Sequence, residues 1–129
     1  MRNNGFRFSE RSLKNLEGVH PDLVAVAHAA LAKTSVDFVV TEGLRTLERQ
    51  RQLIDKGVSL TMKSRHLTGH AIDVAAYDGG VWWDWPLYEK IAAAFKSAAH
   101  ELKVPIVWGG DWRVFKDGPH FELDRKVYP

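Results

Sequence analysis

The sequence predicts an α+β fold in which a small antiparallel sheet is flanked by helices. Helical patterns gather towards the first half of the chain, and short β-branched segments are interspersed among them. At 129 residues, with 45% hydrophobic and 26% charged residues, the chain has the size and composition of a globular protein. We therefore expect one domain that spans residues 1–129 and has one core.

The first half of the chain is expected to contain three helices and one strand. Each helix begins with a recognised start signal, a hydroxyl N-cap or a first-turn proline, and the strand is rich in β-branched and aromatic residues. In chain order these are a helix capped by Ser9 that runs to about Leu16, a helix from Pro21 with an apolar face through Leu31, a strand from Val36 to Glu42, and a helix capped by Thr46 that runs to about Asp55.

The second half begins with a polar, irregular stretch from Gly57 to Leu67, which we expect to be a loop. An apolar segment, an Asp-Gly-Gly turn and a second apolar segment then predict a β-hairpin. The clearest one-sided apolar stripe follows and predicts a helix, with two short strands after it. These elements are expected at His70 to Tyr77, Val81 to Trp85, Leu87 to Leu102, Ile106 to Trp108 and His120 to Leu123.

Charge and composition exclude several classes of protein. The net charge of +2 comes without a basic run flanked by aromatics, so nucleic-acid binding is not expected. The chain has no cysteine, which removes disulfides and thiolate chemistry and leaves histidines and carboxylates as metal ligands. The N-terminus lacks the apolar core of a signal peptide, and no stretch is apolar enough to cross a bilayer. We expect synthesis in the cytoplasm and no stable membrane association.

Two separated motifs carry the residue types of a catalytic metal site. Two imidazoles, one ligating carboxylate and one spare carboxylate match a zinc site that keeps a coordination position open. Gly69 permits the turn that would let His66 and Asp73 converge, and His120 would join them from a distant strand. The motifs are Ser64-x-His66-x-x-Gly69-x-Ala71-x-Asp73 and Asp117-Gly118-Pro119-His120.

A zinc-activated water needs a proton acceptor, and Asp117 is the nearest carboxylate to His120 in the sequence. Pro119 restricts the backbone between them, which favours a fixed carboxylate beside the metal. We assign Asp117 as general base and then as general acid to the leaving amine. Glu122 is the competing carboxylate, because strand alternation places it on the same face as His120.

Both motifs, with their spacing, resemble the zinc D-alanyl-D-alanine carboxypeptidase and L-alanyl-D-glutamate endopeptidase family, which shares its metal-site fold with Hedgehog domains. The similarity extends to residues 41–46 and 108–112 and so covers most of the chain. The whole chain looks like the short endolysins of phages that infect Gram-negative bacteria. The resemblance implies a Hedgehog/DD-peptidase-like fold and a Zn²⁺ cofactor.

The resemblance also implies roles for individual residues. His66, Asp73 and His120 would bind zinc, Asp117 would be the catalytic acid and base, and Arg45 would lie near the substrate carbonyl or carboxylate. Arg45 has a physical rationale as well, because a cation stabilises a developing oxyanion; its alternative is a surface salt bridge. Glu42 stands where relatives often have serine, which leaves the polarity of the groove open.

Three further residues are candidates for substrate binding. Ser64 would meet the substrate or support the His66 loop. Trp108 and Trp112 sit beside glycines and would line a groove or belong to the core, and Gly109 and Gly110 would let a substrate backbone approach closely. For Trp85 the core is the favoured place.

The reaction that we predict is cleavage of the L-alanyl-D-glutamate bond in peptidoglycan stem peptides, leading to wall degradation and host lysis. A short chain has little length for the lid of an exopeptidase pocket, which favours an endopeptidase. The alternatives are a D-alanyl-D-alanine carboxypeptidase and a non-catalytic, zinc-stabilised wall-binding module. By resemblance, peptidoglycan is the partner, the protein is a monomer, and it accumulates in the host cytoplasm before reaching the periplasm during lysis.

Overall fold

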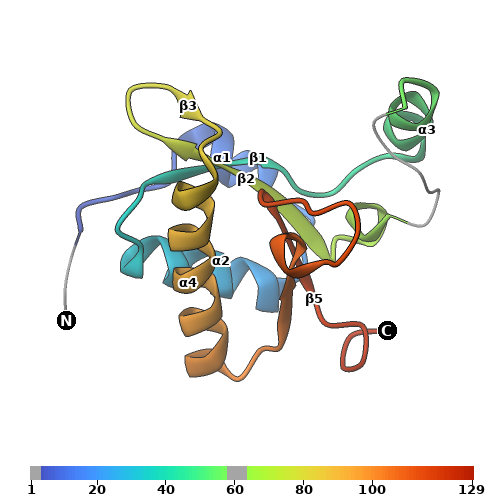
Figure 1. Cartoon of the computed structure of the whole chain (residues 1–129). Helices are drawn as coiled ribbons and strands as arrows, with labels where there is room; N and C mark the ends of the chain where they lie inside the picture. Colours follow the sequence, from blue (N-terminus) through green and yellow to red (C-terminus); the bar gives the residue numbers. More distant parts are fainter. Residues whose placement is uncertain (1–3, 58–63) are drawn as a thin grey trace.

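The computed structural model describes residues 4–57 and 64–129 and contains an antiparallel sheet with helices packed against it (Figure 1). This arrangement confirms the predicted α+β class. In chain order the elements are α1 (Glu10–Asn15), α2 (Pro21–Lys33), β1 (Phe38–Glu42), α3 (Leu47–Asp55), the 3-10 turn η1 (Arg65–Thr68), β2 (Ala71–Tyr77), β3 (Val81–Trp82), α4 (Trp85–Leu102), β4 (Ile106–Trp108), the 3-10 turn η2 (Gly109–Asp111) and β5 (His120–Leu123).

The helices begin close to their predicted start signals. The Ser9 hydroxyl accepts a hydrogen bond from the Ser12 amide at the start of α1, and Thr46 does the same for the Arg49 amide in α3. Pro21 is the first residue of α2, where its missing N–H costs no hydrogen bond. Each signal acts locally, which is why the sequence alone located it.

The start of α4 differs from its prediction. The helix begins at Trp85, with Asp84 as N-cap, two residues before the predicted start at Leu87. Pro86 explains the difference, because its fixed φ suits a first helical turn and its missing N–H cannot extend a strand ladder. The predicted hairpin strand from Val81 to Trp85 therefore shortens to the two residues of β3.

The sheet has the order β1-β2-β5-β4, and β3 pairs with β2 outside this path. Alternate residues of β2 face opposite sides, so Ile72, Val74 and Ala76 join the core while Asp73 lies on the other face. In β5 the core residues are Phe121 and Leu123. The sheet thus divides into a core face and a face that carries polar residues of both motifs.

Helices α2 and α4 pack against each other and cover the core face of the sheet (Figure 1). The Phe95 ring of α4 stacks on Phe121 with ring centroids 3.9 Å apart, and it also contacts Phe38 of β1 at 5.3 Å. These buried aromatic contacts join the longest helix to two strands. They fix the position of β5 relative to α4 and β1.

Part of the loop that we predicted from Gly57 to Leu67 lies outside the described residues, namely 58–63. Its last residues form η1, which the sequence did not predict because a single 3-10 turn has no periodic signal. Gly69 ends η1 with a φ of +73°, which agrees with the expected turn at this glycine. Among the described residues, no helix is long and apolar enough to cross a bilayer.

Substitution of Gly69 tests how tightly this turn is packed. A Cβ at Gly69 would lie 2.5 Å from the Gly18 carbonyl oxygen, in addition to the positive φ. We expect Gly69→Ala to lower the free energy of unfolding by roughly 2 to 4 kcal/mol, the sum of backbone strain and steric overlap. Urea unfolding measures the difference.

Gly79→Ala is the matched control, because Gly79 also has a positive φ, of 68°, but its Cβ would meet no atom within 4 Å. This variant should lose only the backbone strain, about 1 to 2 kcal/mol. Equal losses in the two variants would contradict the close packing of Gly69 against Gly18.

Candidate metal centre and active site

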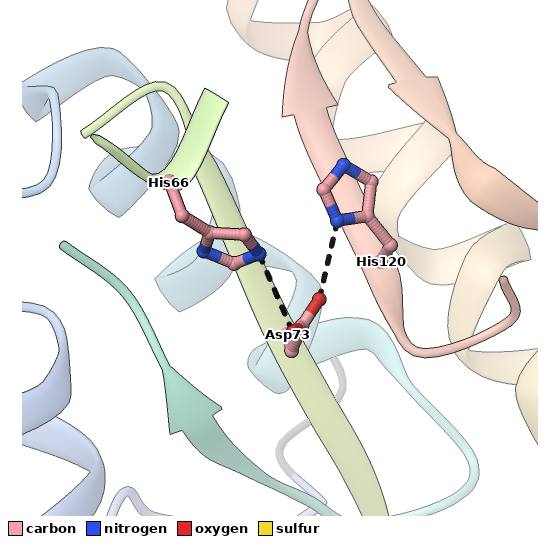
Figure 2. Close-up of side chains that lie close together, drawn as sticks. All are labelled: His66, Asp73 and His120. Atoms are coloured by element: carbon pink, nitrogen blue, oxygen red, sulfur yellow. Dashed lines mark hydrogen bonds and ion pairs between the residues drawn. The ribbon is translucent and has the colours of Figure 1, made fainter. Parts of the chain in front are cut away.

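Three elements bring His66, Asp73 and His120 together. Asp73 of β2 and His120 of β5 are directly paired across the sheet, so their side chains share one face. His66 reaches the same point from η1. The Asp73 carboxylate lies between the two rings, with Oδ2 3.3 Å from His66 Nε2 and Oδ1 3.2 Å from His120 Nδ1 (Figure 2).

The orientation of His66 is set by the backbone at the end of β1. Its Nδ1 lies 2.8 Å from the Gly43 carbonyl oxygen. A carbonyl oxygen only accepts, so Nδ1 carries the proton and Nε2 keeps its lone pair. Nε2 is buried and has no hydrogen-bond partner of good geometry among the described residues, although Asp73 is close. An orphaned buried nitrogen of this kind suits a metal ligand.

The orientation of His120 is set by Glu122, two residues further along β5. Glu122 Oε1 lies 2.9 Å from His120 Nε2, and both side chains are almost fully buried. Burial raises the pKa of Glu122, but the hydrogen bond from His120 and nearby positive charges lower it below its usual range. The ionised carboxylate therefore accepts the Nε2 proton, and Nδ1 is left to face Asp73.

Glu122 was the competitor of Asp117 for the role of general base. Its predicted position on the same face as His120 agrees with the structure, but its carboxylate contacts the ring nitrogen that points away from Asp73. Arg65 Nε and Arg125 Nε lie 3.8 and 3.6 Å from its Oε2 and balance its charge. Glu122 is thus placed to orient a ligand rather than to receive a proton from water.

The three side chains fit a divalent metal ion. One ligand atom from each lies within 4.8 Å of the other two. The two imidazole nitrogens approach different oxygens of Asp73, Oδ2 at 3.3 Å and Oδ1 at 3.2 Å, so both rings and the carboxylate face one point. Burial raises the pKa of Asp73, but the interactions with His120 and His66 lower it far more, so the carboxylate is ionised.

Asp117 lies in a tight turn just before β5, the strand that pairs with β2. Its amide donates to the Gly109 carbonyl at 3.0 Å, and its carbonyl accepts from the His120 amide at 3.2 Å. Burial, and then the charge of Asp73, raise the pKa of Asp117, while His120, His66 and Arg45 oppose the shift. Asp117 therefore lies among the charged groups of the site, with a raised pKa that suits proton uptake and release.

Of the two places that the sequence left open for Trp108, the structure supports the core. Trp108 is only 7% exposed, and its Nε1 donates to the Gly118 carbonyl at 2.7 Å, behind the Asp117 turn. Gly109 and Gly110 do not make room for a substrate backbone either. A Cβ on Gly109 would overlap the Asp117 carbonyl, and a Cβ on Gly110 would overlap the Trp108 ring. These residues pack against the turn at Asp117 and Gly118.

The other tryptophans also differ in their surroundings. Trp112 is partly exposed and its ring centroid lies 5.1 Å from that of His120, so it flanks the metal group, and substrate binding stays a prediction for it. Trp85 is 42% exposed, which corrects the expectation that it belongs to the core.

Arg45 is held in place by a group of polar side chains. Its guanidinium donates from Nε and Nη2 to both carboxylate oxygens of Glu42, at 2.7 and 2.8 Å, and from Nη1 to Gln50 and to Ser64. Nη2 lies 3.9 Å from Asp73 Oδ2. The ion pair that was the alternative for Arg45 is therefore present, but it is partly buried and lies beside the metal group.

Two of these contacts concern residues whose roles were open. Ser64 caps η1, because its hydroxyl accepts from the His66 amide at 3.3 Å, and this supports the structural alternative. Glu42 is a residue that the sequence did not assign, and here it fixes Arg45. Its position three residues before Arg45, at a strand exit, was the available signal.

Comparison with known structures defines the class of protein first. The chain superposes on the vancomycin resistance D,D-dipeptidase VanXYg, solved with a D-Ala-D-Ala phosphinate analogue, with a TM-score of 0.59 and 23% identity over 81% of this chain and 50% of that one. This similarity confirms the Hedgehog/DD-peptidase fold. The sequence model for phage L-alanyl-D-glutamate peptidases matches residues 4–128, and the chain belongs to that family.

Two relatives are similar over almost the whole chain. The Serratia marcescens L-Ala D-Glu endopeptidase ChiX has 50% identity and a TM-score of 0.91, covering 98% of this chain and 96% of its own. The L-alanyl-D-glutamate peptidase of Escherichia phage T5 is 37% identical over 128 residues, 95% of this chain and 93% of the relative.

The charge of His120 makes the stability of the metal-free protein depend on pH. Burial lowers the pKa of His120, but Asp73 and Glu122 raise it to about 9. Because the folded pKa lies above the unfolded value near 6.5, this stabilisation is complete below pH 6.5 and is lost as pH rises through 9. We expect the free energy of unfolding to fall by about 2 to 3 kcal/mol between these values. His120→Gln should flatten this slope in urea titrations, and an unchanged slope would contradict the assignment.

Removal of the Glu122 carboxylate tests its role in orienting His120. We expect Glu122→Ala to weaken the affinity for Zn²⁺, used as the probe ion, by about 10- to 100-fold, because Nε2 loses the acceptor that fixes the ring. Glu122→Gln keeps an acceptor oxygen and should lose less. Competition with a chromophoric chelator measures both, and wild-type affinity in Glu122→Ala would refute this role.

Proposed function

We propose that this protein is a zinc-dependent endolysin that hydrolyses the L-alanyl-D-glutamate bond of peptidoglycan stem peptides and so degrades the bacterial wall during host lysis. The observation that carries the proposal is the Asp73 carboxylate held between His66 and His120, with Asp117 beside them, in a member of the L-alanyl-D-glutamate peptidase family. The family makes the protein a peptidase, and these side chains supply its chemistry.

Zinc is the metal that suits this donor set best. Two imidazoles and one carboxylate leave one position open in a tetrahedral site, the arrangement of catalytic rather than structural zinc. When bound, zinc polarises the scissile carbonyl and makes water a nucleophile at neutral pH. The orphaned Nε2 of His66 and the Nδ1 of His120 would hold the ion together with Asp73.

The remaining residues would handle protons and developing charge. Asp117 would take a proton from the attacking water and deliver it to the amine of D-glutamate as the peptide bond breaks. Arg45 would stabilise the negative charge that develops on the carbonyl oxygen, since its fixed guanidinium lies beside Asp73. Trp112 would form a wall of the substrate groove next to His120. Ser64 would contribute to substrate binding chiefly by holding Arg45 and η1.

The scissile bond and the place of action that we propose are based on the relatives. The relatives from Serratia marcescens and phage T5 are named for L-alanyl-D-glutamate cleavage, and both align over nearly the whole chain. We propose that one domain, acting as a monomer on peptidoglycan, performs the same cleavage. It would accumulate in the host cytoplasm and meet its substrate in the periplasm during lysis.

Digestion of purified peptidoglycan with the zinc-loaded protein tests the assignment. We expect new D-glutamate amino termini, identified by mass spectrometry of the soluble products. Asp117→Ala should lower kcat by about 10²- to 10⁴-fold, because the proton acceptor is gone while the ligands remain, so zinc stays bound. His120→Ala should lose both zinc and activity.

Asp111→Ala is the matched control, because this exposed carboxylate pairs with Lys96 and takes no part in the site. It should keep wild-type kcat. Release of free D-alanine alone would replace the proposal with a D-alanyl-D-alanine carboxypeptidase. Undiminished lysis by Asp117→Ala would favour a wall-binding module that uses zinc only for stability.

A further inference from the structure

A β-bulge turns Glu42 onto the face of the sheet that carries the metal group. Val40 pairs with Val74 and Glu42 pairs with Asp73, so two steps along β1 match one step along β2. Without the bulge Thr41 would stand opposite Asp73, and Glu42 would lie on the core face with Val40. Because directly paired residues share a face, the bulge makes the Glu42 and Asp73 carboxylates neighbours.

Arg45 lies close to both carboxylates but is hydrogen-bonded to only one of them. Its Nε and Nη2 donate to the two oxygens of Glu42, at 2.7 and 2.8 Å, whereas Nη2 lies 3.9 Å from Asp73 Oδ2. This edge of the planar guanidinium fits one carboxylate at a time. The contacts with Glu42 therefore hold Arg45 outside hydrogen-bond distance of Asp73.

The opposite end of the guanidinium is also occupied. Nη1 donates to Gln50 at 2.7 Å and to Ser64 at 3.3 Å. A guanidinium has five N–H groups, and Glu42, Gln50 and Ser64 together accept from four of them. The fifth N–H is on Nη2, the nitrogen that lies nearest to Asp73. The three acceptors thus fix the guanidinium and leave one donor on the side of the metal group.

Asp73 is the anion that Arg45 would meet if Glu42 were absent. The Arg45 side chain is only 8% exposed, and a buried cation without a counter-ion is costly. A shift of about 1 Å would bring Nη2 within hydrogen-bond distance of Asp73 Oδ2. That oxygen is the one directed at His66 (Figure 2). A guanidinium bound there would compete with a metal ion for the same carboxylate.

We propose that Glu42 is a positioning residue that keeps Arg45 from pairing with Asp73, and so keeps the Asp73 carboxylate available as a metal ligand. This inference rests on the proposed function, because it takes the group around Asp73 as the site of the catalytic ion. The effect of Glu42 passes through the guanidinium, so it should depend on the presence of Arg45.

Zinc affinity in the absence of substrate measures this effect. The full chain is used, Zn²⁺ is the probe ion, and a chromophoric chelator competes for it. We expect Glu42→Ala to weaken the affinity by about 10- to 100-fold, because Arg45 then occupies Asp73. Glu42→Gln keeps one acceptor oxygen for the guanidinium and should weaken the affinity by less.

A double-mutant cycle with Arg45 separates positioning from a simple loss of charge. Arg45→Ala removes the competing cation, so its zinc affinity should equal or exceed that of the wild type. In the Arg45→Ala background, the loss of affinity caused by Glu42→Ala should be smaller by a factor of about five or more. If Glu42→Ala does not fold, Glu42→Gln completes the same cycle. Glu48→Ala, which removes an exposed carboxylate of α3, is the matched charge control and should bind Zn²⁺ like the wild type.

The zinc dependence of peptidoglycan cleavage provides a second readout. In Glu42→Ala the half-activating Zn²⁺ concentration should rise by the same factor as the affinity falls, because excess zinc displaces Arg45 from Asp73 by mass action. A merely structural role of Glu42 would lower the activity at every zinc concentration without shifting this midpoint, and that result would contradict the proposal.

The outcomes separate this inference from the proposed function. Wild-type zinc affinity in Glu42→Ala, or an equal loss of affinity with and without Arg45, would overturn the positioning role and leave the peptidase intact. Zinc binding that shows the expected coupling, without cleavage of peptidoglycan, would refute the peptidase and support the role of Glu42. A wild-type chain that binds no zinc would overturn both.

Discussion

The register of β5 against β2 is the constraint on which the rest of the site depends. Asp73 and His120 are direct partners in this register, so one ligand pair is built by backbone hydrogen bonding alone. A slip by one residue would turn His120 towards the core and Phe121 towards the metal group. The stack of Phe121 on Phe95 opposes such a slip, because it anchors the core side of β5 to α4. Core packing therefore sets the geometry of the ligands.

The two histidines meet the metal position with opposite ring nitrogens. His66 presents Nε2 because the Gly43 carbonyl holds its Nδ1, and His120 presents Nδ1 because Glu122 holds its Nε2. One acceptor is neutral and comes from the backbone, while the other is charged and is balanced by arginines. The negative charge around the candidate ion is thus spread over Asp73 and Glu122. Arg45 lies beside Asp73, and Arg65 lies beside Glu122.

Local signals in the sequence predicted much of this structure. N-caps and a first-turn proline located the helices, and the ligand types, together with their glycine turn, identified the residues that converge on Asp73. Ring orientation could not be predicted, because it depends on the Gly43 carbonyl and on Glu122 after the chain has folded. The burial of Trp108 could not be predicted from the sequence either. Its flanking glycines fit an open groove and a packed ring equally well until the Asp117 turn is in place.

Strand β5 has only four residues, and they alternate between the ligand side and the core. Phe121 lies between His120 and Glu122 in the chain, so no part of this strand can open without disturbing both sides of the sheet. A cation that binds only the intact centre would therefore protect the entire molecule by mass action. Metal supply in the cell would govern the lifetime of the folded chain against proteolysis as well as its competence as an enzyme.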